Sequence, residues 1–327
     1  MNPEAFLGDL ERKPEAMRRL AGSLTLAGEH GGPWPHVTAR RVVMIGMGSS
    51  RYAAGAAATS MRMAGLEAVA EHASLVAGTP PSGDVLAVGI SASGETAETI
   101  ESLARHRGVS ATVALTNRAG AAIERAADSV VPMLAGDEEG GVACRTFQHT
   151  LALLLALGAS AAGAPLSGVA ESVRRAAEAS GDLLERRDTW LPQAADLLAE
   201  GPATFTIAPA ERLSSAEQGA LMFREGPRRS ADACESGDWL HVDVYLTKTL
   251  DYRALLFAGS CFDSAIVEWM RERGSKVVAV GSGLDGVDLT VRYRHDDDPT
   301  VAVFTEVLVA ELIAARWWIA QPGPHGA

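Results

Sequence analysis

Hydroxyl-bearing side chains gather in one short stretch of this 327-residue chain. Residues 91–96 read Ser-Ala-Ser-Gly-Glu-Thr and follow an apolar run, so they mark the point where a buried strand turns into a helix. The hydroxyls of Ser91, Ser93 and Thr96 would lie beside helix N-terminal amides that have no partner within the helix. Gly94 lies inside the same turn. Hydroxyl donors and the positive end of a helix dipole together suit a phosphate or another anion.

A second turn has the same context. Gly48, Ser49 and Ser50 follow the apolar run 41–46 and precede an Ala-rich helix. Both turns are expected at the carboxyl ends of parallel strands, the edge at which open α/β sheets bind ligands. The alternative is that these Ser and Thr residues only cap their helices. Two such turns in one predicted sheet favour phosphate binding over capping alone.

These turns and a third segment resemble the SIS (sugar isomerase) domains of glucosamine-6-phosphate synthase and its relatives. That family carries a Gly-Thr-Ser turn, an Ile-Ser-x-Ser-Gly-Glu-Thr loop and a Gly-Val-Ala-Ser-Thr-Lys segment. The matching stretches here are residues 48–50, 90–96 and 141–146, the last reading Gly-Val-Ala-Cys-Arg-Thr. The resemblance implies a sugar-phosphate site, with these contact residues: Gly48, Ser49, Ser50, Ser91, Ser93, Gly94, Thr96, Val142, Ala143 and Cys144.

Three details qualify the match. Family members usually have Gln between the two loop serines, where this chain has Ala92, and Ser where it has Cys144. These changes leave the phosphate contacts in place and affect the expected contacts with the sugar ring. An acid near Glu139 approaches the site in the family, which makes Glu139 a further candidate.

The second half of the chain holds a candidate catalytic pair. Residues 220–225, Ala-Leu-Met-Phe-Arg-Glu, resemble the family's Ala-Leu-Lys-x-Lys-Glu helix, and residues 237–243 resemble its Gly-Glu-x-x-His-Gly-Pro segment. The resemblance implies that Glu225 is the enolisation base and that His241 assists ring opening. A carboxylate can move a carbon-bound proton and an imidazole a hydroxyl proton. In the family this histidine comes from the neighbouring subunit, which implies a homodimer. The alternative reading is an exposed helix acid and a loop histidine.

Departures from the synthases narrow the expected chemistry. The chain shows no glutaminase domain, its C-terminal tail has no lysine, and Met222 replaces the first lysine of the helix motif. We therefore expect neither ammonia from glutamine nor a protein-bound Schiff base. Enediol or enolamine chemistry needs only a carbon base and a proton shuttle.

Strands and helices must alternate to position these residues. Apolar runs predict strands, joined by helical patterns. The predicted strands are 41–46, 68–70, 84–90, 111–115 and 129–134 in the first half, then 203–208, 253–259 and 276–281 in the second. The predicted helices include 7–24, 52–64, 97–107, 120–127, 144–161 and 265–273. We expect an α/β fold of two tandem SIS domains, each a parallel sheet flanked by helices in a flavodoxin-like sandwich.

The predicted organisation has four parts. An N-terminal helical segment covers residues 1–35 and ends at a Gly-Gly-Pro-Trp-Pro breaker over 31–35. The first SIS domain covers 36–165 and binds the phosphosugar, a helical linker covers 166–200, and the second SIS domain covers 201–327. The recurring phrase of strand, serine turn, helix and strand in both halves indicates an internal repeat.

Composition excludes several classes of protein. Apolar residues make up 47% and charged residues 21%, as in globular proteins, and the net charge of −12 argues against nucleic acid as a partner. No apolar stretch is long enough for a membrane span, and the acidic N-terminus is not a secretory signal, so we expect a cytoplasmic protein. Residues 295–298, His-Asp-Asp-Asp, precede Pro299 and predict a solvated turn, so we expect no metal and no cofactor.

The sequence thus predicts an enzyme that binds a phosphorylated sugar or amino sugar. The expected activity is that of an aldose–ketose isomerase, or of an amino-sugar-phosphate deaminase or deglycase, through an enediol-like intermediate. The alternative is a non-catalytic phosphosugar sensor. The first 40 residues are too short and too acidic for a DNA-binding segment, which favours the enzyme. The changes at Ala92, Cys144 and Met222 favour the sensor.

Overall fold

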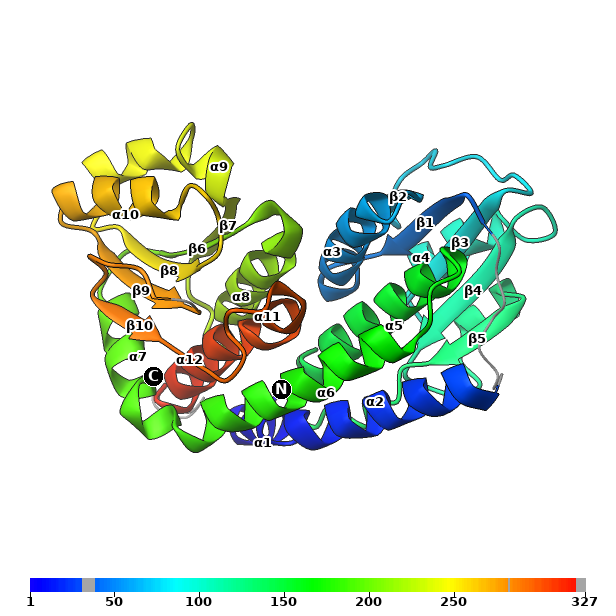
Figure 1. The fold of residues 1–327 in the computed structure, drawn as a ribbon, viewed down its shortest axis with the longest axis horizontal. Coiled ribbons are helices and arrows are strands. Elements are labelled where there is room, and N and C mark those ends of the chain that lie inside the picture. The colour runs from blue at the N-terminus through cyan, green and yellow to red at the C-terminus, as the bar shows by residue number, and fades with distance from the viewer. Residues whose placement is uncertain (31–38, 282, 322–327) are drawn as a thin grey trace. The chain divides into compact units, whose positions relative to one another are not determined.

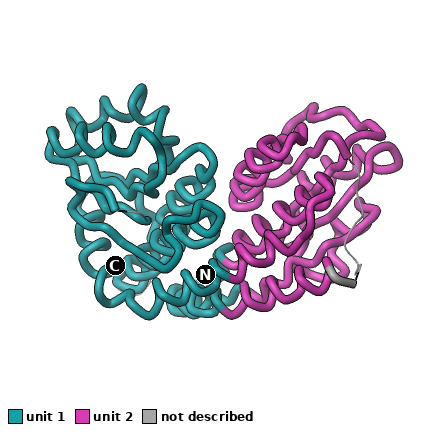
Figure 2. The backbone as a smooth tube through the Cα atoms, viewed as in Figure 1, with its two compact units in different colours: residues 1–14, 138–144, 175–327 teal, residues 15–137, 145–174 magenta. Residues whose placement is uncertain are grey.

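The computed structural model describes residues 1–30, 39–281 and 283–321 and divides into two compact units (Figures 1 and 2). One unit comprises residues 1–14, 138–144 and 175–327, and the other comprises residues 15–137 and 145–174. We call them the C-terminal unit and the N-terminal unit. The predicted linker 166–200 holds helices, and the boundary between the units falls inside one of them, at residues 174 and 175. The predicted breaker 31–35 lies outside the described residues.

A five-stranded parallel sheet forms the centre of the N-terminal unit, in the order β2-β1-β3-β4-β5 (Figure 1). Its strands are β1 (Arg41–Gly46), β2 (Glu67–His72), β3 (Val85–Ile90), β4 (Ala111–Thr116) and β5 (Ser129–Pro132). The central strand β3 is buried along its whole length, because its sequence Val-Leu-Ala-Val-Gly-Ile is apolar on both faces. In the register between β1 and β3, Arg41 lies opposite Val85 and Ile45 opposite Gly89.

Helices cover this sheet on both faces. They are α2 (Lys13–His30), α3 (Ser49–Met63), α4 (Ala97–Ala104), α5 (Arg145–Ala161) and α6 (Ser167–Glu185), of which α2 and α6 extend into the C-terminal unit. The predicted helix 120–127 is instead the short 3₁₀ turn η1 (Ala122–Ala126). One core cluster packs Val43, Ile45 and Leu103 between the sheet and α4.

The C-terminal unit contains a second five-stranded parallel sheet, ordered β10-β9-β8-β6-β7. Read from β7, this is the same order as in the first sheet, which confirms an α/β fold with two parallel sheets. Its strands are β6 (Thr204–Ala208), β7 (Ala231–Glu235), β8 (Arg253–Phe257), β9 (Lys276–Val280) and β10 (Leu289–Val291). The sequence did not predict β7 or β10, because Ala-Asp-Ala-Cys-Glu is not apolar and β10 has only three residues.

The helices of the C-terminal unit come from both ends of the chain. They are α1 (Pro3–Glu11), α7 (Leu191–Ala199), α8 (Leu213–Glu225), α9 (Ser236–Trp239), α10 (Asp263–Glu272), α11 (Pro299–Thr305) and α12 (Val307–Ile319), with 3₁₀ turns η2 (Arg187–Thr189), η3 (Ala210–Arg212) and η4 (Asp243–Lys248). The predicted helix 7–24 is two helices, since the chain breaks at Arg12. Pro14 explains the break, because proline has no backbone N–H to donate to the carbonyl one turn earlier and its ring crowds that turn.

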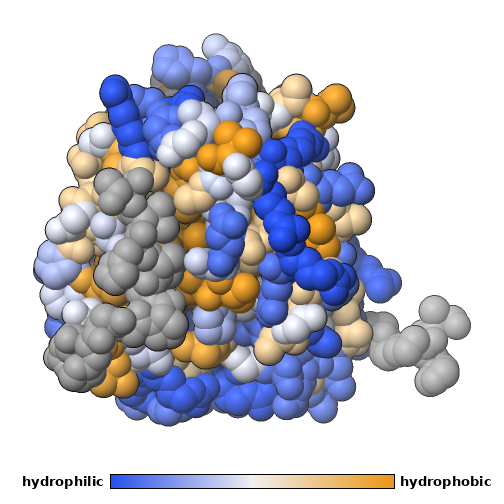
Figure 3. Space-filling view, turned by 90° about the vertical axis from the view of Figure 1, so that its right-hand side faces the viewer, coloured by the Kyte–Doolittle hydropathy of each residue, from blue (hydrophilic) through white to orange (hydrophobic). Residues whose placement is uncertain are grey.

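On the face drawn in Figure 3, the apolar side chains of the described residues form scattered patches among charged ones. In the part of the chain that the structure describes, no helix combines the length and apolar character needed to cross a membrane. These observations agree with the mixed composition of the sequence.

Candidate active site

The loop after β3 brings the three predicted hydroxyls together. The Ser91 Oγ lies 2.9 Å from the Thr96 Oγ1 and 3.4 Å from the Ser93 Oγ. Backbone amides hold the loop closed, because Gly94 donates to the Ser91 Oγ at 3.0 Å and Glu95 donates to the Ser93 Oγ at 3.2 Å. Ser91 is buried and Ser93 is exposed, so the cluster reaches from the sheet to the surface.

Thr96 does not cap the helix that it precedes. It occupies the N-cap position of α4, yet its side chain makes no capping hydrogen bond, since its hydroxyl pairs with Ser91. The first amides of a helix have no intrahelical acceptor and carry its partial positive charge. Thr96 therefore does not cap α4, whereas Ser91 and Ser93 accept backbone amides within the turn.

Gly94 allows this loop to form. Its φ of +69° lies in the left-handed region, and an added Cβ would lie 2.3 Å from the Ala121 Cβ and 2.8 Å from the Thr116 Oγ1. No other residue type meets both requirements without displacing its neighbours. The loop is further fixed by Glu95, whose side chain accepts from the Ala122 amide at 3.0 Å.

The turn after β1 lies beside this loop, because β1 and β3 are neighbours and run in the same direction. Gly48 has a φ of +50° and is the N-cap of α3, so no side chain caps this helix either. Ser49 and Ser50 form the first positions of α3. The strand order reverses between β1 and β3, and the carboxyl ends of strands at such a switch point form the ligand crevice of doubly wound sheets.

Residues 138–144 belong to the C-terminal unit, although the chain on either side of them belongs to the N-terminal unit. Helix α1 holds this segment at Gly140, whose amide donates to the Asp9 Oδ2 at 2.7 Å and whose carbonyl accepts from the Asn2 amide at 3.1 Å. An added Cβ at Gly140 would lie 2.5 Å from the Phe6 Cα, so the backbones touch. No local pattern in the sequence predicts that the N-terminus holds this segment.

The predicted contact residues of the segment are largely buried. Val142 and Cys144 are 2% and 0% exposed, and Ala143 is half-buried. Burial raises the pKa of the Cys144 thiol well above its ordinary value, and the nearby charge of Glu138 acts in the same direction. Cys144 is therefore a packing residue and not a nucleophile.

Glu225 is the last residue of α8 and is half-buried. Burial raises the pKa of its carboxyl group above the ordinary value of 4.5, and the negative charge of Glu138 raises it further. Among the residues that the structure describes, none donates a hydrogen bond to this carboxylate. A half-buried acid with a raised pKa and no protein partner has the properties of a general base or acid.

Glu138, and not Glu139, is the acid whose charge raises the pKa of Glu225. The Glu139 side chain is 65% exposed and its Oε2 lies 3.6 Å from the guanidinium of Arg12. The Glu138 Oε1 accepts the Cys144 amide at 2.7 Å, which directs the carboxylate into the segment. Sequence reasoning missed Glu138 because two adjacent acids precede the segment and only the backbone turn decides which of them points inward.

His241 lies in an exposed turn after α9. Helix α8 ends at Glu225, shortly before β7, and α9 and His241 follow after the other end of that strand. Five residues of strand span roughly 16 Å. Within one chain, Glu225 and His241 therefore flank opposite ends of β7.

The other polar motifs have structural roles. His295 shares hydrogen bonds with Glu178 at 3.1 Å and Arg175 at 3.2 Å, and no cluster of three metal-ligating side chains occurs in the described ranges. The buried His149 contacts the Met133 carbonyl at 2.7 Å. Trp317 packs on Phe223 with ring centroids 5.0 Å apart, as expected for a packing residue.

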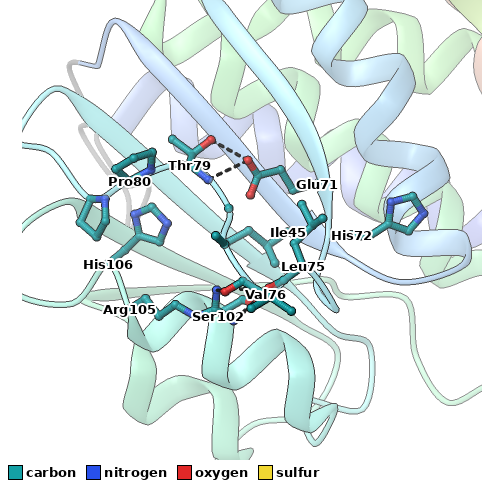
Figure 4. A pocket seen from close by; sticks show the side chains of 13 residues that line it. Ile45, Glu71, His72, Leu75, Val76, Thr79, Pro80, Ser102, Arg105 and His106 are labelled. Carbon is teal, nitrogen blue, oxygen red and sulfur yellow. Dashed lines mark hydrogen bonds between the residues drawn. The ribbon is translucent and has the colours of Figure 1, made fainter.

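A cavity of about 160 Å³ in the N-terminal unit lies away from these residues, beneath the chain that links β2 to β3 (Figure 4). Its polar groups bind one another: Glu71 accepts from both the amide and the hydroxyl of Thr79, and Arg105 donates to the carbonyls of Leu75 and Val76. These hydrogen bonds hold the connection between β2 and β3, which contains no helix, in place. The cavity contains no residue of the candidate site.

Comparison with protein families finds a match in the first half of the chain. The family model described as SIS domain matches residues 37–160, which include both hydroxyl-bearing turns and the 138–144 segment. A curated relative, the glutamine–fructose-6-phosphate aminotransferase (isomerizing) of Methanothermobacter thermautotrophicus, is 30% identical over 223 residues, covering 66% of this chain and 37% of the relative. The chain spans 37–42% of the length of the curated relatives it matches.

Solved structures share the fold over nearly the whole chain. The C-terminal domain of glucosamine-fructose-6-phosphate aminotransferase from Francisella tularensis superposes with a TM-score of 0.83 at 18% identity, covering 96% of each chain. The glucosamine-6-phosphate deaminase of Thermotoga maritima gives a TM-score of 0.73 at 16% identity, covering 96% of this chain and 94% of that one. Both sheets therefore belong to an architecture found in other proteins.

Proposed function

Residues 37–160 form a SIS domain, and from this premise we propose that the protein is an enzyme that converts a phosphorylated sugar or amino sugar through an enediol-like intermediate. The observation that carries the proposal is Glu225, a half-buried acid with a raised pKa and no protein partner, next to the 138–144 segment. The relatives named above act on fructose 6-phosphate and glucosamine 6-phosphate by their names, which gives the class of substrate to test.

The phosphate group is assigned to the first sheet. Its oxygens would accept hydrogen bonds from the hydroxyls of Ser91, Ser93 and Thr96 and from the uncapped start of α4. Ser49 and Ser50 would add donors from the neighbouring strand end. A dianion gains most from such a site because charge-assisted hydrogen bonds are about twice as strong as neutral ones.

Proton transfer is assigned to Glu225. Its carboxylate takes the proton from the carbon next to the sugar carbonyl, the electron pair of that C–H bond forms the carbon–carbon double bond, and the carbonyl oxygen takes up a proton. The protonated Glu225 then returns its proton to the adjacent carbon, while the hydroxyl on the other enediol carbon loses its proton and becomes the new carbonyl. An isomerase releases this carbonyl compound. In a deaminase the intermediate is an enolamine, whose protonation at carbon gives an imine that adds water and releases ammonia.

Deuterium exchange tests this assignment directly. Fructose 6-phosphate and glucosamine 6-phosphate are incubated with the enzyme in D₂O, and mass spectrometry follows replacement of the carbon-bound hydrogen. We expect Glu225→Gln to abolish exchange while calorimetry shows retained phosphosugar binding, and Glu268→Gln, an exposed acid on α10, to behave as wild type. Undiminished exchange in Glu225→Gln would remove the base from its role. Saturable binding by the wild type without exchange or conversion would support the sensor.

His241 takes part only if it comes from a second copy of the chain, since β7 separates it from Glu225 within one chain. The proposed homodimer predicts complementation between two inactive variants. Glu225→Gln and His241→Ala chains, inactive alone, regain up to a quarter of wild-type activity when coexpressed, because some mixed dimers contain one intact site. No recovery, with mixed dimers present by native mass spectrometry, contradicts the shared site.

A further inference from the structure

Gln218 lies on the helix that carries Glu225. It is fully buried and precedes Glu225 by seven residues on α8. Seven residues are close to two helical turns, so both side chains project from the same face of the helix, about 10 Å apart along its axis. Gln218 therefore lies on the same face of α8 as Glu225, the proposed base.

The carboxamide of Gln218 connects α8 to the 138–144 segment. Its Nε2 donates to the Ala143 carbonyl at 2.9 Å and contacts the Met222 Sδ at 3.7 Å. The carbonyl fixes the orientation of the amide, since only the nitrogen can donate to it. Because α1 holds the same segment at Gly140, the two ends of the segment have different anchors.

The other end of the amide shows that this arrangement is costly. The Gln218 Oε1 is buried and has no hydrogen-bond partner among the residues that the structure describes. A methionine would fill a similar volume without burying an unpaired oxygen. The side-chain nitrogen explains a glutamine at this position, because it holds the backbone of Ala143 at a fixed place relative to the end of α8.

We propose that Gln218 is a positioning residue, which sets the distance between the sugar-contacting backbone of residues 142–144 and the carboxylate of Glu225. The inference rests on the proposed function, because it assumes that Glu225 is the base. It predicts that loss of the amide donor impairs the proton-transfer step more than phosphosugar binding, because the phosphate contacts lie on other elements.

The first test replaces the donor by an apolar side chain of similar size. For Gln218→Met, we expect kcat for deuterium exchange to fall on the order of 10²-fold, the effect of an ångström-scale misplacement of a reacting group. The KM for the phosphosugar should change by less than about threefold, since uniform binding is retained. The matched control is Gln193→Met, an exposed glutamine on α7. An unchanged kcat in Gln218→Met, or an equal loss in the control, overturns the inference.

The second test gives a signature that a purely structural role does not produce. In Gln218→Glu the protonated carboxyl can still donate to Ala143, whereas the ionised form cannot. We expect this variant to fold and turn over at low pH and to lose kcat as the pH rises, over a range in which the wild type keeps its kcat. A pH profile of kcat with the wild-type shape contradicts the role of the donor.

The two levels of the argument fail separately. If Glu225→Gln still exchanges deuterium, the proposed function fails, whatever Gln218 does. If Glu225→Gln is inactive while Gln218→Met and Gln218→Glu both keep wild-type kcat and pH dependence, the function stands and only the positioning role is wrong.

Discussion

Single residues decide the protonation chemistry of the proposed site. Burial and the negative charge of Glu138 both raise the pKa of the Glu225 carboxyl group and so favour its protonated form. Met222, one turn before Glu225, offers no positive charge to oppose them. The proposed base therefore has a raised pKa, which suits a group that must both accept and return a proton.

Removing the charge of Glu138 should shift the pH dependence. Glu225 must be ionised to act as a base, so activity rises with pH through the Glu225 pKa. Glu138→Gln removes a like charge and lowers that pKa, so the acid limb of kcat/KM moves to lower pH. The control is Glu139→Gln. The Glu139 carboxylate is exposed and pairs with Arg12, so this variant should leave the acid limb in place. A Glu138→Gln profile that coincides with wild type would show that the two carboxylates do not interact.

At the scale of elements, the proposed phosphate-binding loop, residues 91–96, forms where β3 passes into α4. The strand is apolar throughout and the helix starts without a side-chain cap. The polar groups of the turn between them must therefore form hydrogen bonds with one another. It does so through the Ser91 and Thr96 hydroxyls and the left-handed Gly94. A ligand phosphate would exchange these weak internal contacts for charge-assisted ones.

Gly94→Ala tests the loop. The added methyl group would clash with Ala121 and Thr116, and the φ of residue 94 is unfavourable for alanine. We therefore expect calorimetry to show that phosphosugar binding is lost. Gly108→Ala, with a φ of +77° and nothing within 4 Å of the added Cβ, isolates the backbone term, about 1–2 kcal/mol in urea unfolding. Gly94→Ala should destabilise more than that. Wild-type affinity in Gly94→Ala contradicts the loop's role.

At the scale of the whole chain, the C-terminal unit is assembled from three distant stretches. Residues 1–14 pack with 138–144 and with the C-terminal helices. A buried ion pair joins them: the Lys13 ammonium contacts the Glu311 carboxylate of α12, and both side chains are 0% exposed. Burial of Glu311 raises the pKa of its carboxyl group, and the charge of Lys13 opposes that shift.

Breaking this pair should be costly and its joint removal mild. Lys13→Met leaves a buried carboxylate without its partner, so we expect a loss of about 3–5 kcal/mol in the free energy of unfolding measured in urea. The double variant Lys13→Met with Glu311→Leu should recover most of that loss. Arg19→Met, which breaks an exposed pair with Glu15, should cost no more than about 1 kcal/mol. Equal losses in the single and double variants would show that packing, not charge, is what Lys13 supplies.

The sequence by itself determined most of what is local. Apolar strands followed by hydroxyl-bearing turns predicted the parallel sheets and placed Ser91, Ser93 and Thr96 at a strand end, because hydrophobic burial and turn chemistry act over a few residues. It did not reveal the polar edge strand β7, which exists because β6 offers it a partner.

Only the tertiary structure decided which distant groups meet. The inward turn of Glu138, the amide link from Gln218 to Ala143 and the pairing of Lys13 with Glu311 each join stretches that no local pattern connects. The tertiary structure also separates His241 from Glu225 within one chain, since β7 lies between them and carries the chain to its other end. Such contacts depend on the path of the whole backbone, whereas the hydroxyl contacts of the strand-end turn form within its own six residues.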